Sequence, residues 1–221
     1  MVNLGVADSC QLLAQASAGI FTLCDSSFTI YVNKVAGGVL QFGWMASGPL
    51  TLILAVNRLF SIWMPVAEES PRLSVPYKIA LGVSWLIAVV FFASYMTPYT
   101  AVLYFPEQFA WNYDNGPWSE FISSCELYGM FAVFTLCGLI YAIIFVRMYR
   151  FRMQASHSSR ELRILVQAVI ISGYTSSCLI TWHTYQYFLP DTKITQFCLN
   201  MMNIINPSIN PILYLMLNPF V

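Results

Sequence analysis

The chain has 221 residues, of which 58% are hydrophobic and 9% are charged, and its formal net charge at pH 7 is zero. Soluble domains usually contain about 25% charged residues, so this chain has too few charges to coat a soluble protein of its size. The composition therefore indicates a protein surrounded by lipid.

Six apolar segments are each close to the length of about 20 residues that a helix needs to cross a bilayer. In chain order they are residues 1–23, 37–63, 77–96, 120–146, 164–188 and 194–217. We therefore predict an all-α fold, a polytopic membrane bundle of six transmembrane helices that forms one domain. The expected surroundings are the lipid bilayer, and no nucleic-acid partner is expected.

The basic residues predict the orientation of these segments. Eight of the ten Lys and Arg residues lie in or beside two connections. They are Arg58, Arg72, Lys78, Arg147, Arg150, Arg152, Arg160 and Arg163. Because Lys and Arg collect on the cytoplasmic side, loops 65–77 and 147–163 are predicted to be cytoplasmic and loop 97–119 extracellular. That outer loop is rich in aromatic residues, which indicates either an aromatic belt at the lipid headgroups or a lid over an extracellular pocket.

Polar residues inside the apolar segments are the first candidates for function, since they are expensive in lipid. Asp8 lies in the first segment and Ser47 in the second. The last segment carries a polar stripe at helical spacing, made of Gln196, Asn200, Asn203, Asn206 and Asn210.

Asp8, Ser47, Asn206 and Asn210 can meet at one depth of a six-helix bundle. One carboxylate, one hydroxyl and two amide oxygens suit a small hard cation or trapped water. The alternative is that these side chains hydrogen-bond the helices to one another.

The last segment also contains two Asn-Pro pairs, at 206–207 and 210–211. A proline removes a backbone hydrogen bond, but membrane helices tolerate it because neighbouring groups satisfy the freed carbonyls. The pairs predict a kinked membrane helix.

Several motifs, in order and in topology, resemble those of rhodopsin-like (class A) G-protein-coupled receptors. Residues 210–214, Asn-Pro-Ile-Leu-Tyr, are similar to that family's Asn-Pro-x-x-Tyr. Residues 57–59, Asn-Arg-Leu, are similar to its Asp-Arg-Tyr, and Leu4 with Asp8 to the Leu-x-x-x-Asp of its second helix. Trp85 and Tyr141 match further single positions. The six segments would be helices two to seven, so we expect a receptor domain over residues 1–221 that lacks its first helix and a C-terminal tail.

The chain departs from the pattern of that family at several positions. Asn57 replaces the acid that pairs with the arginine in the resting state, and residues 178–181 read Cys-Leu-Ile-Thr in place of Cys-Trp-x-Pro. Asn33 stands where a disulfide cysteine is usual, and loop 97–119 contains no cysteine. The family's extracellular disulfide therefore cannot form. The outer cysteines Cys24, Cys125 and Cys198 leave a substitute bridge open. The Asn-Arg variant and the short loops resemble nematode serpentine chemoreceptors of the Srx or Srt kind.

The resemblance implies a role for each of several residues. A ligand pocket would be built from Gln41, Trp44, Trp182, His183, Gln186, Gln196 and Asn203. Glu126 is a further candidate, although it could instead face the headgroups. The switch that couples to a heterotrimeric G protein would use Asn57, Arg58, Tyr141, Glu161, Pro211 and Tyr214. The site at Asp8, Ser47, Asn206 and Asn210 would hold an allosteric sodium ion.

The predicted function is therefore a chemosensory receptor for a small molecule, located in the plasma membrane. Asn203 stands where opsins need a lysine, and Leu40 where aminergic receptors place an aspartate, which disfavours retinal and cationic amines as ligands. The alternative class is a six-span transporter or channel, or a receptor fragment that does not signal. No enzyme is expected, because no nucleophile with a base and no histidine-rich metal set is present. No cofactor is expected other than the sodium ion.

Overall fold

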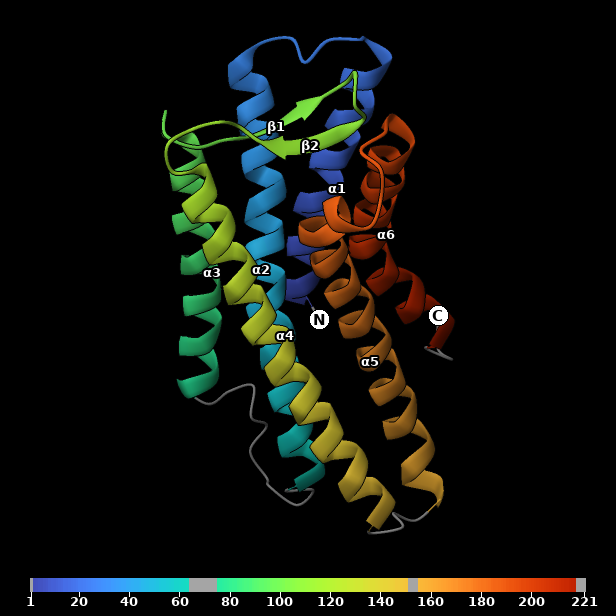
Figure 1. The fold of residues 1–221 in the computed structure, drawn as a ribbon. Helices are drawn as coiled ribbons and strands as arrows, with labels where there is room; N and C mark the ends of the chain where they lie inside the picture. The colour runs from blue at the N-terminus through green and yellow to red at the C-terminus, as the bar shows by residue number, and fades with distance from the viewer. Residues whose placement is uncertain (1, 64–74, 151–154, 218–221) are drawn as a thin grey trace.

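The computed structural model describes residues 2–63, 75–150 and 155–217, with the side chains of 155–164 and 213–217 outside the description. Its helices are α1 (Val2–Leu23), α2 (Ile30–Trp63), α3 (Val75–Met96), α4 (Ser119–Arg150), α5 (Ala155–Thr184) and α6 (Lys193–Leu217), with a short 3-10 turn at Tyr185–Tyr187. Each helix corresponds to one of the six predicted segments, although α5 ends at Thr184, before the predicted end at residue 188. The helices run side by side as a bundle (Figure 1).

The central element of the bundle is α2, which packs against α1, α3 and α4, while α6 packs against α1 and α5. Small residues allow the close approach of these helices. A Cβ atom on Gly43 would lie 2.5 Å from the backbone oxygen of Ala7, and one on Gly48 would lie 2.6 Å from the sulfur of Met130. Such contacts through small residues are typical of helices that associate in lipid.

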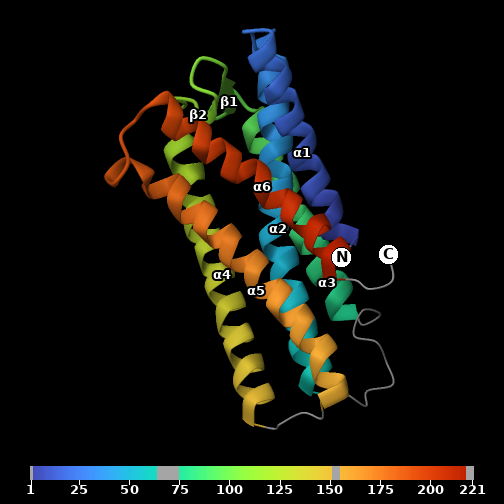
Figure 2. The same ribbon diagram turned by 90° about the vertical axis from the view of Figure 1, so that its right-hand side faces the viewer.

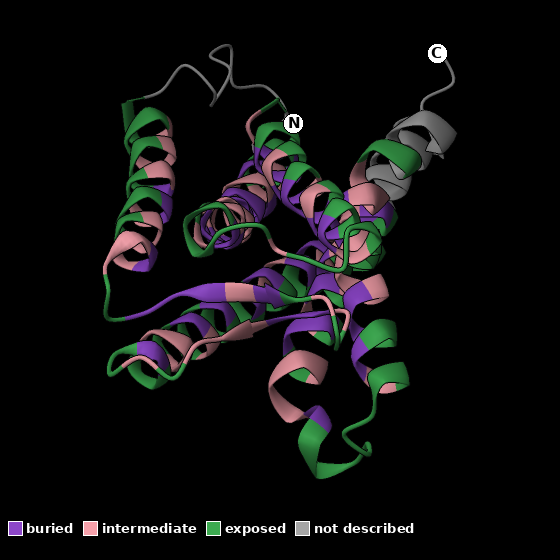
Figure 3. Ribbon diagram, turned by 90° about the horizontal axis from the view of Figure 1, so that it is seen from above, coloured by how far each residue is buried: buried purple, intermediate pink, exposed green. Residues whose placement is uncertain are grey.

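The pattern of burial is the reverse of that in a soluble helix. The buried face of α1 carries Asp8, Gln11 and Gln15, whereas Leu13 is 69% exposed and Ile20 is 53% exposed. Exposed residues lie on the outward faces of the helices (Figure 3), and many of them are large and apolar, such as Val90 of α3 and Phe131 of α4. An apolar exterior around a polar interior is stable only when the exterior is in contact with lipid.

Four of the helices, α2, α3, α4 and the part of α5 from Leu165, are long and apolar enough to cross a membrane. In α1 and α6 the apolar sequence is interrupted by the polar residues of the buried stripes. The structure therefore supports a helical membrane bundle, while six crossings remain a prediction.

An antiparallel hairpin, which the sequence did not predict, caps one end of the bundle. Strand β1 (Val102–Phe105) pairs with β2 (Ala110–Tyr113), in the register Val102 with Tyr113. The hairpin lies across the ends of the helices (Figures 1 and 2). Helix α2 begins seven residues before the predicted segment, because its extra turns reach and support β1.

Two features fasten the hairpin to α2. The side chain of Asn33 makes a pair of hydrogen bonds with the backbone of Tyr104: its Nδ2 donates to the carbonyl at 2.9 Å, and its Oδ1 accepts from the amide at 2.8 Å. One turn further along, a Cβ atom on Gly37 would lie only 1.9 Å from the carbonyl oxygen of Val102. The strand therefore lies directly on the helix backbone.

Candidate functional site

Beneath the hairpin, between α1, α2, α4, α5 and α6, lies a cavity, which we call the outer cavity. The lining comprises Gln11, Gln15, Leu40, Gln41, Trp44, Val102, Trp111, Tyr113, Glu126, Cys178, Leu179, Trp182, Asn203 and Asn206.

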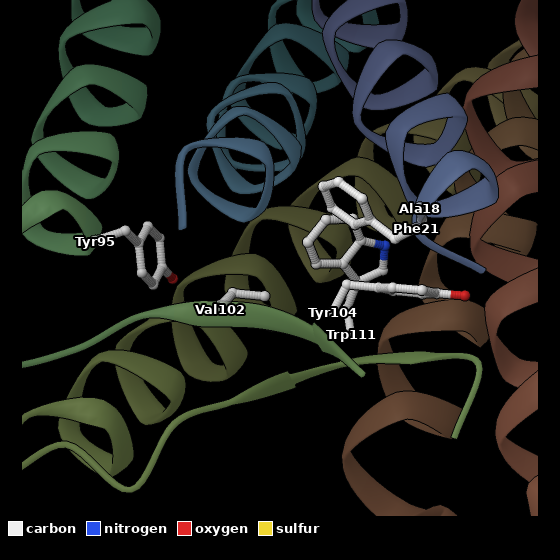
Figure 4. Close-up of a cluster of buried hydrophobic side chains, with 6 residues drawn as sticks. All are labelled: Ala18, Phe21, Tyr95, Val102, Tyr104 and Trp111. Atoms are coloured by element: carbon white, nitrogen blue, oxygen red, sulfur yellow. The ribbon is translucent and has the colours of Figure 1, made fainter. Parts of the chain in front are cut away.

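The hairpin forms the roof of this cavity. Trp111 is buried in a cluster with Phe21 and Tyr104, where the hairpin meets α1 and α2 (Figure 4). The indole Nε1 of Trp111 donates to Oε1 of Gln15 at 3.1 Å, and the Tyr104 hydroxyl pairs with Thr22 at 2.6 Å. Of the two alternatives for the outer loop, the structure therefore supports the lid. Tyr99 and Trp118 stack on each other at the exposed end of the loop.

A buried carboxyl group lies at one side of the cavity. Glu126 of α4 is 4% exposed, and its Oε2 accepts hydrogen bonds from Nε2 of Gln41 at 3.0 Å and from the Tyr113 hydroxyl. The hydroxyl of Tyr95, from α3, lies 3.0 Å from that of Tyr113. Because Tyr113 uses its single proton towards Glu126, Tyr95 acts as the donor in this pair. The network joins α2, α3, α4 and β2.

The phenol of Tyr113 remains protonated in this network. Its burial, and then the neighbouring Glu126 carboxyl, hold the pKa of Tyr113 well above its ordinary value. Both causes disfavour the phenolate, because burial removes its hydration and the carboxylate repels it. Tyr113 is therefore a permanent donor to Glu126 at neutral pH.

The outer cavity brings together four of the seven residues predicted for the ligand pocket: Gln41, Trp44, Trp182 and Asn203. The other three, His183, Gln186 and Gln196, do not line it. Gln196 instead donates to the Tyr185 hydroxyl at 2.8 Å and to Asp191 at 3.0 Å, which holds the connection between α5 and α6. Gln186 is exposed.

Sequence reasoning missed Gln11 and Gln15. Together with Asp8 they continue a polar stripe at spacings of three and four, which was a usable signal for one buried face of the first helix. Glu126, which was only a further candidate, faces the cavity and not the headgroups.

The four residues predicted for a cation site make three separate hydrogen bonds. Asp8 Oδ2 accepts from Nδ2 of Asn210 at 2.7 Å, and Asn206 Oδ1 accepts from the Thr175 hydroxyl at 2.8 Å. The Ser47 hydroxyl donates to the Trp44 carbonyl within its own helix. The contacts of Asp8 with Asn210 and of Asn206 with Thr175 agree with hydrogen bonding between helices, whereas that of Ser47 does not join two helices. Sodium binding stays a prediction.

A second cavity lies nearer the opposite end of the bundle, and we call it the inner cavity. Its lining includes Arg58, Tyr141, Gln167 and Asn210. Three residues predicted for the switch or the cation site therefore meet there. Asn57 is buried beside Arg58, and Pro211 is exposed on α6. The side chains of Glu161 and Tyr214 lie outside the described residues, so their predicted roles are not tested.

The fold and its cavities define a helical membrane protein with a lidded cavity at one end of the bundle and a second cavity, lined by an arginine, towards the other. Residues 16–218 match the family of serpentine type 7TM GPCR chemoreceptors, Srx, and the chain belongs to this family.

A further similarity exists with galanin receptor type 3, from Mus musculus and from Homo sapiens. Each is 29% identical to this chain over 106 residues, which cover 47% of this chain and 29% of the relative. The matched part is thus under a third of the relatives' length. The predicted resemblance to G-protein-coupled receptors, including the Srx kind, is confirmed.

Proposed function

We propose that this chain forms the ligand-binding and signal-transmitting part of a chemosensory receptor in the plasma membrane. The ligand is a small molecule in the outer cavity, and the partner is a heterotrimeric G protein at the opposite end. Loops 65–77 and 147–163 then face the cytoplasm, and the hairpin faces outward. Membership of the Srx family favours this function over a transporter or channel.

One observation carries the proposal: the same five helices line both cavities, and in α6 the two linings are only one turn apart. Asn206 lines the outer cavity and Asn210, one turn further along α6, lines the inner cavity with Arg58. Pro207 and Pro211 lie within the same stretch of α6. A ligand that prefers one conformation of this stretch also shifts the population of conformations of the inner cavity.

The inner cavity is where coupling is expected. A ligand that changes α6 moves Asn210 relative to Asp8 and alters the surroundings of Arg58, which becomes accessible to the G protein. The buried Asn57 replaces the acid that would restrain Arg58, so the resting state should be weakly held and basal signalling measurable without a ligand.

The test is basal nucleotide exchange on a G protein by the full-length receptor in membranes. We expect Arg58→Ala to abolish exchange and Asn57→Asp to lower it, because the new carboxylate pairs with Arg58. Lys78→Ala is the matched control, since Lys78 is an exposed cation at the start of α3. Equal exchange by the Arg58 and Lys78 variants, at equal surface expression, would refute the proposal.

A further inference from the structure

Two amide groups of α1 face the outer cavity without protein partners. Gln11 and Gln15 are 3% and 6% exposed, one turn apart, and both line the cavity. In the described part of the chain, the Nε2 atom of each has no hydrogen-bond partner. The hydrogen bond with Trp111 fixes the orientation of the Gln15 amide. Because Oε1 of Gln15 accepts this bond, the NH₂ group of Gln15 points away from Trp111.

Buried N–H groups nearly always have an acceptor in a protein. Two unpaired NH₂ groups on one wall of a cavity therefore indicate that the missing acceptor belongs to whatever fills the cavity. Their spacing of four residues on one helix face places them to share one oxygen or to bind two neighbouring ones.

The charge of the occupant follows from the rest of the lining. Among the described residues, the lining contains Glu126 but no Lys, Arg or His. An anionic ligand would enter a site with a carboxyl group and no cation to compensate it. Glu126 already accepts hydrogen bonds from Gln41 and Tyr113, so the protein supplies its donors and no ligand ammonium group is needed.

Most of the remaining lining is apolar or aromatic: Leu40, Val102, Trp111, Leu179 and Trp182. These walls suit a ligand whose body is hydrocarbon. We propose that the outer cavity takes an uncharged, largely apolar molecule carrying a hydrogen-bond acceptor oxygen, such as a ketone or ester carbonyl, which the NH₂ groups of Gln11 and Gln15 bind. This inference rests on the proposed receptor function and specifies its ligand class.

The experiment uses purified full-length receptor in lipid nanodiscs and measures the unfolding temperature with increasing probe concentration. The probes are small aryl ketones, beginning with acetophenone, each compared with the hydrocarbon, amine and carboxylate of similar shape: ethylbenzene, 1-phenylethylamine and benzoate. Because a ligand that binds only the folded state raises its stability, the ketones are expected to raise the unfolding temperature more than their matched compounds. The hydrocarbons control for partition into lipid.

Gln11→Leu is the decisive variant, because the Gln11 side chain makes no hydrogen bond to the described protein that the change could break. Without a probe, we expect this variant to unfold at the wild-type temperature or above, since an unpaired buried amide is removed. With ketones, its affinity should fall about fivefold, the effect of one lost hydrogen bond. Gln15→Leu should weaken ketone binding similarly, but it also removes the acceptor of Trp111. Gln186→Leu, an exposed glutamine outside the lining, is the matched control.

The proposal is overturned if no ketone exceeds its hydrocarbon, if the amine stabilises most, or if the Gln11 and Gln186 variants respond alike. Basal nucleotide exchange is measured on the wild type and on the Gln186→Leu control, and the two should match. Wild-type receptor that binds ketones but lacks exchange would contradict the proposed signalling function and leave the ligand class standing.

Discussion

Replacing Asn33 with alanine should release the hairpin from the bundle. The change removes both hydrogen bonds to the backbone of Tyr104 and leaves a buried amide and a buried carbonyl unpaired. Each unpaired buried group costs about 1–3 kcal/mol. Water entering the space left by the side chain offsets part of this cost, so we expect the closed hairpin to lose about 2–4 kcal/mol.

This loss shifts the opening equilibrium of the hairpin about 30- to 700-fold, since about 1.4 kcal/mol is a factor of ten. Hydrogen exchange measured by mass spectrometry on peptides covering residues 99–113 reports such local opening. Amide exchange in the hairpin should therefore accelerate by at least about 30-fold, while exchange in the middle of α2 stays unchanged.

Asn112→Ala is the matched control. Its side chain donates to Gln108 in an exposed contact within the same hairpin, and surface changes of this kind are usually within about 0.5 kcal/mol. If the Asn33 and Asn112 variants exchange at the same rate, Asn33 does not fasten the hairpin and the reasoning fails.

Three further changes test other parts of the structure. Gly37→Ala places a methyl group against the Val102 carbonyl, 1.9 Å from the ideal Cβ position, and should lower the free energy of unfolding by about 1–3 kcal/mol. Gly82→Ala, with nothing within 4 Å, should raise it by up to about 1 kcal/mol, and equal effects in thermal unfolding would contradict the close packing. The raised pKa of Tyr113 means that the folded state keeps its proton above about pH 10, where the unfolded chain loses it. The contribution of Tyr113 to the free energy of unfolding is therefore fully present below about pH 10 and is lost as the pH rises towards the folded-state pKa. Tyr113→Phe should reduce this loss in a pH series of unfolding temperatures. Asp8→Asn should remove any difference between sodium and potassium in thermal stability, and a sodium effect that persists in the variant would exclude Asp8 as a ligand.

Much of the bundle was predictable because lipid imposes a simple rule on sequence. A helix that crosses a bilayer needs about 20 apolar residues. All six segments predicted from this rule are helical, and four of the helices are long and apolar enough to cross a membrane. The starts of the helices were less predictable. Residues 30–36 of α2 lie beyond the length that the bilayer requires, and they are helical because they support the hairpin.

The hairpin itself had weak signals. Its strands are four residues long, and a two-stranded hairpin is marginal in isolation. Val102–Phe105 becomes a strand because Asn33 and Gly37 offer it a partner and a flat surface. Both residues are 65 or more positions away in the sequence, so the dependence is visible only in the fold.

The candidate site likewise has one part that the sequence predicted and another that depends on contacts between distant elements. The stripe of asparagines in α6 is local, and its helical spacing predicted that Asn203 and Asn206 lie inside. Glu126 was ambiguous, because one carboxyl near a helix end suits either the headgroups or a pocket. Its environment is set by Gln41 and Tyr113, which come from two other elements.

The fastening of the lid has a consequence for how the receptor responds to its chemical surroundings. All six cysteines are free in the structure, including the outer Cys24, Cys125 and Cys198, and the lid is held by the side-chain amide of Asn33. Hydrogen bonds of this kind break and re-form spontaneously on thermal timescales, without an oxidant or an isomerase. The lid should close equally well on a newly made chain and on a mature one, and a reducing medium should leave access to the outer cavity unchanged.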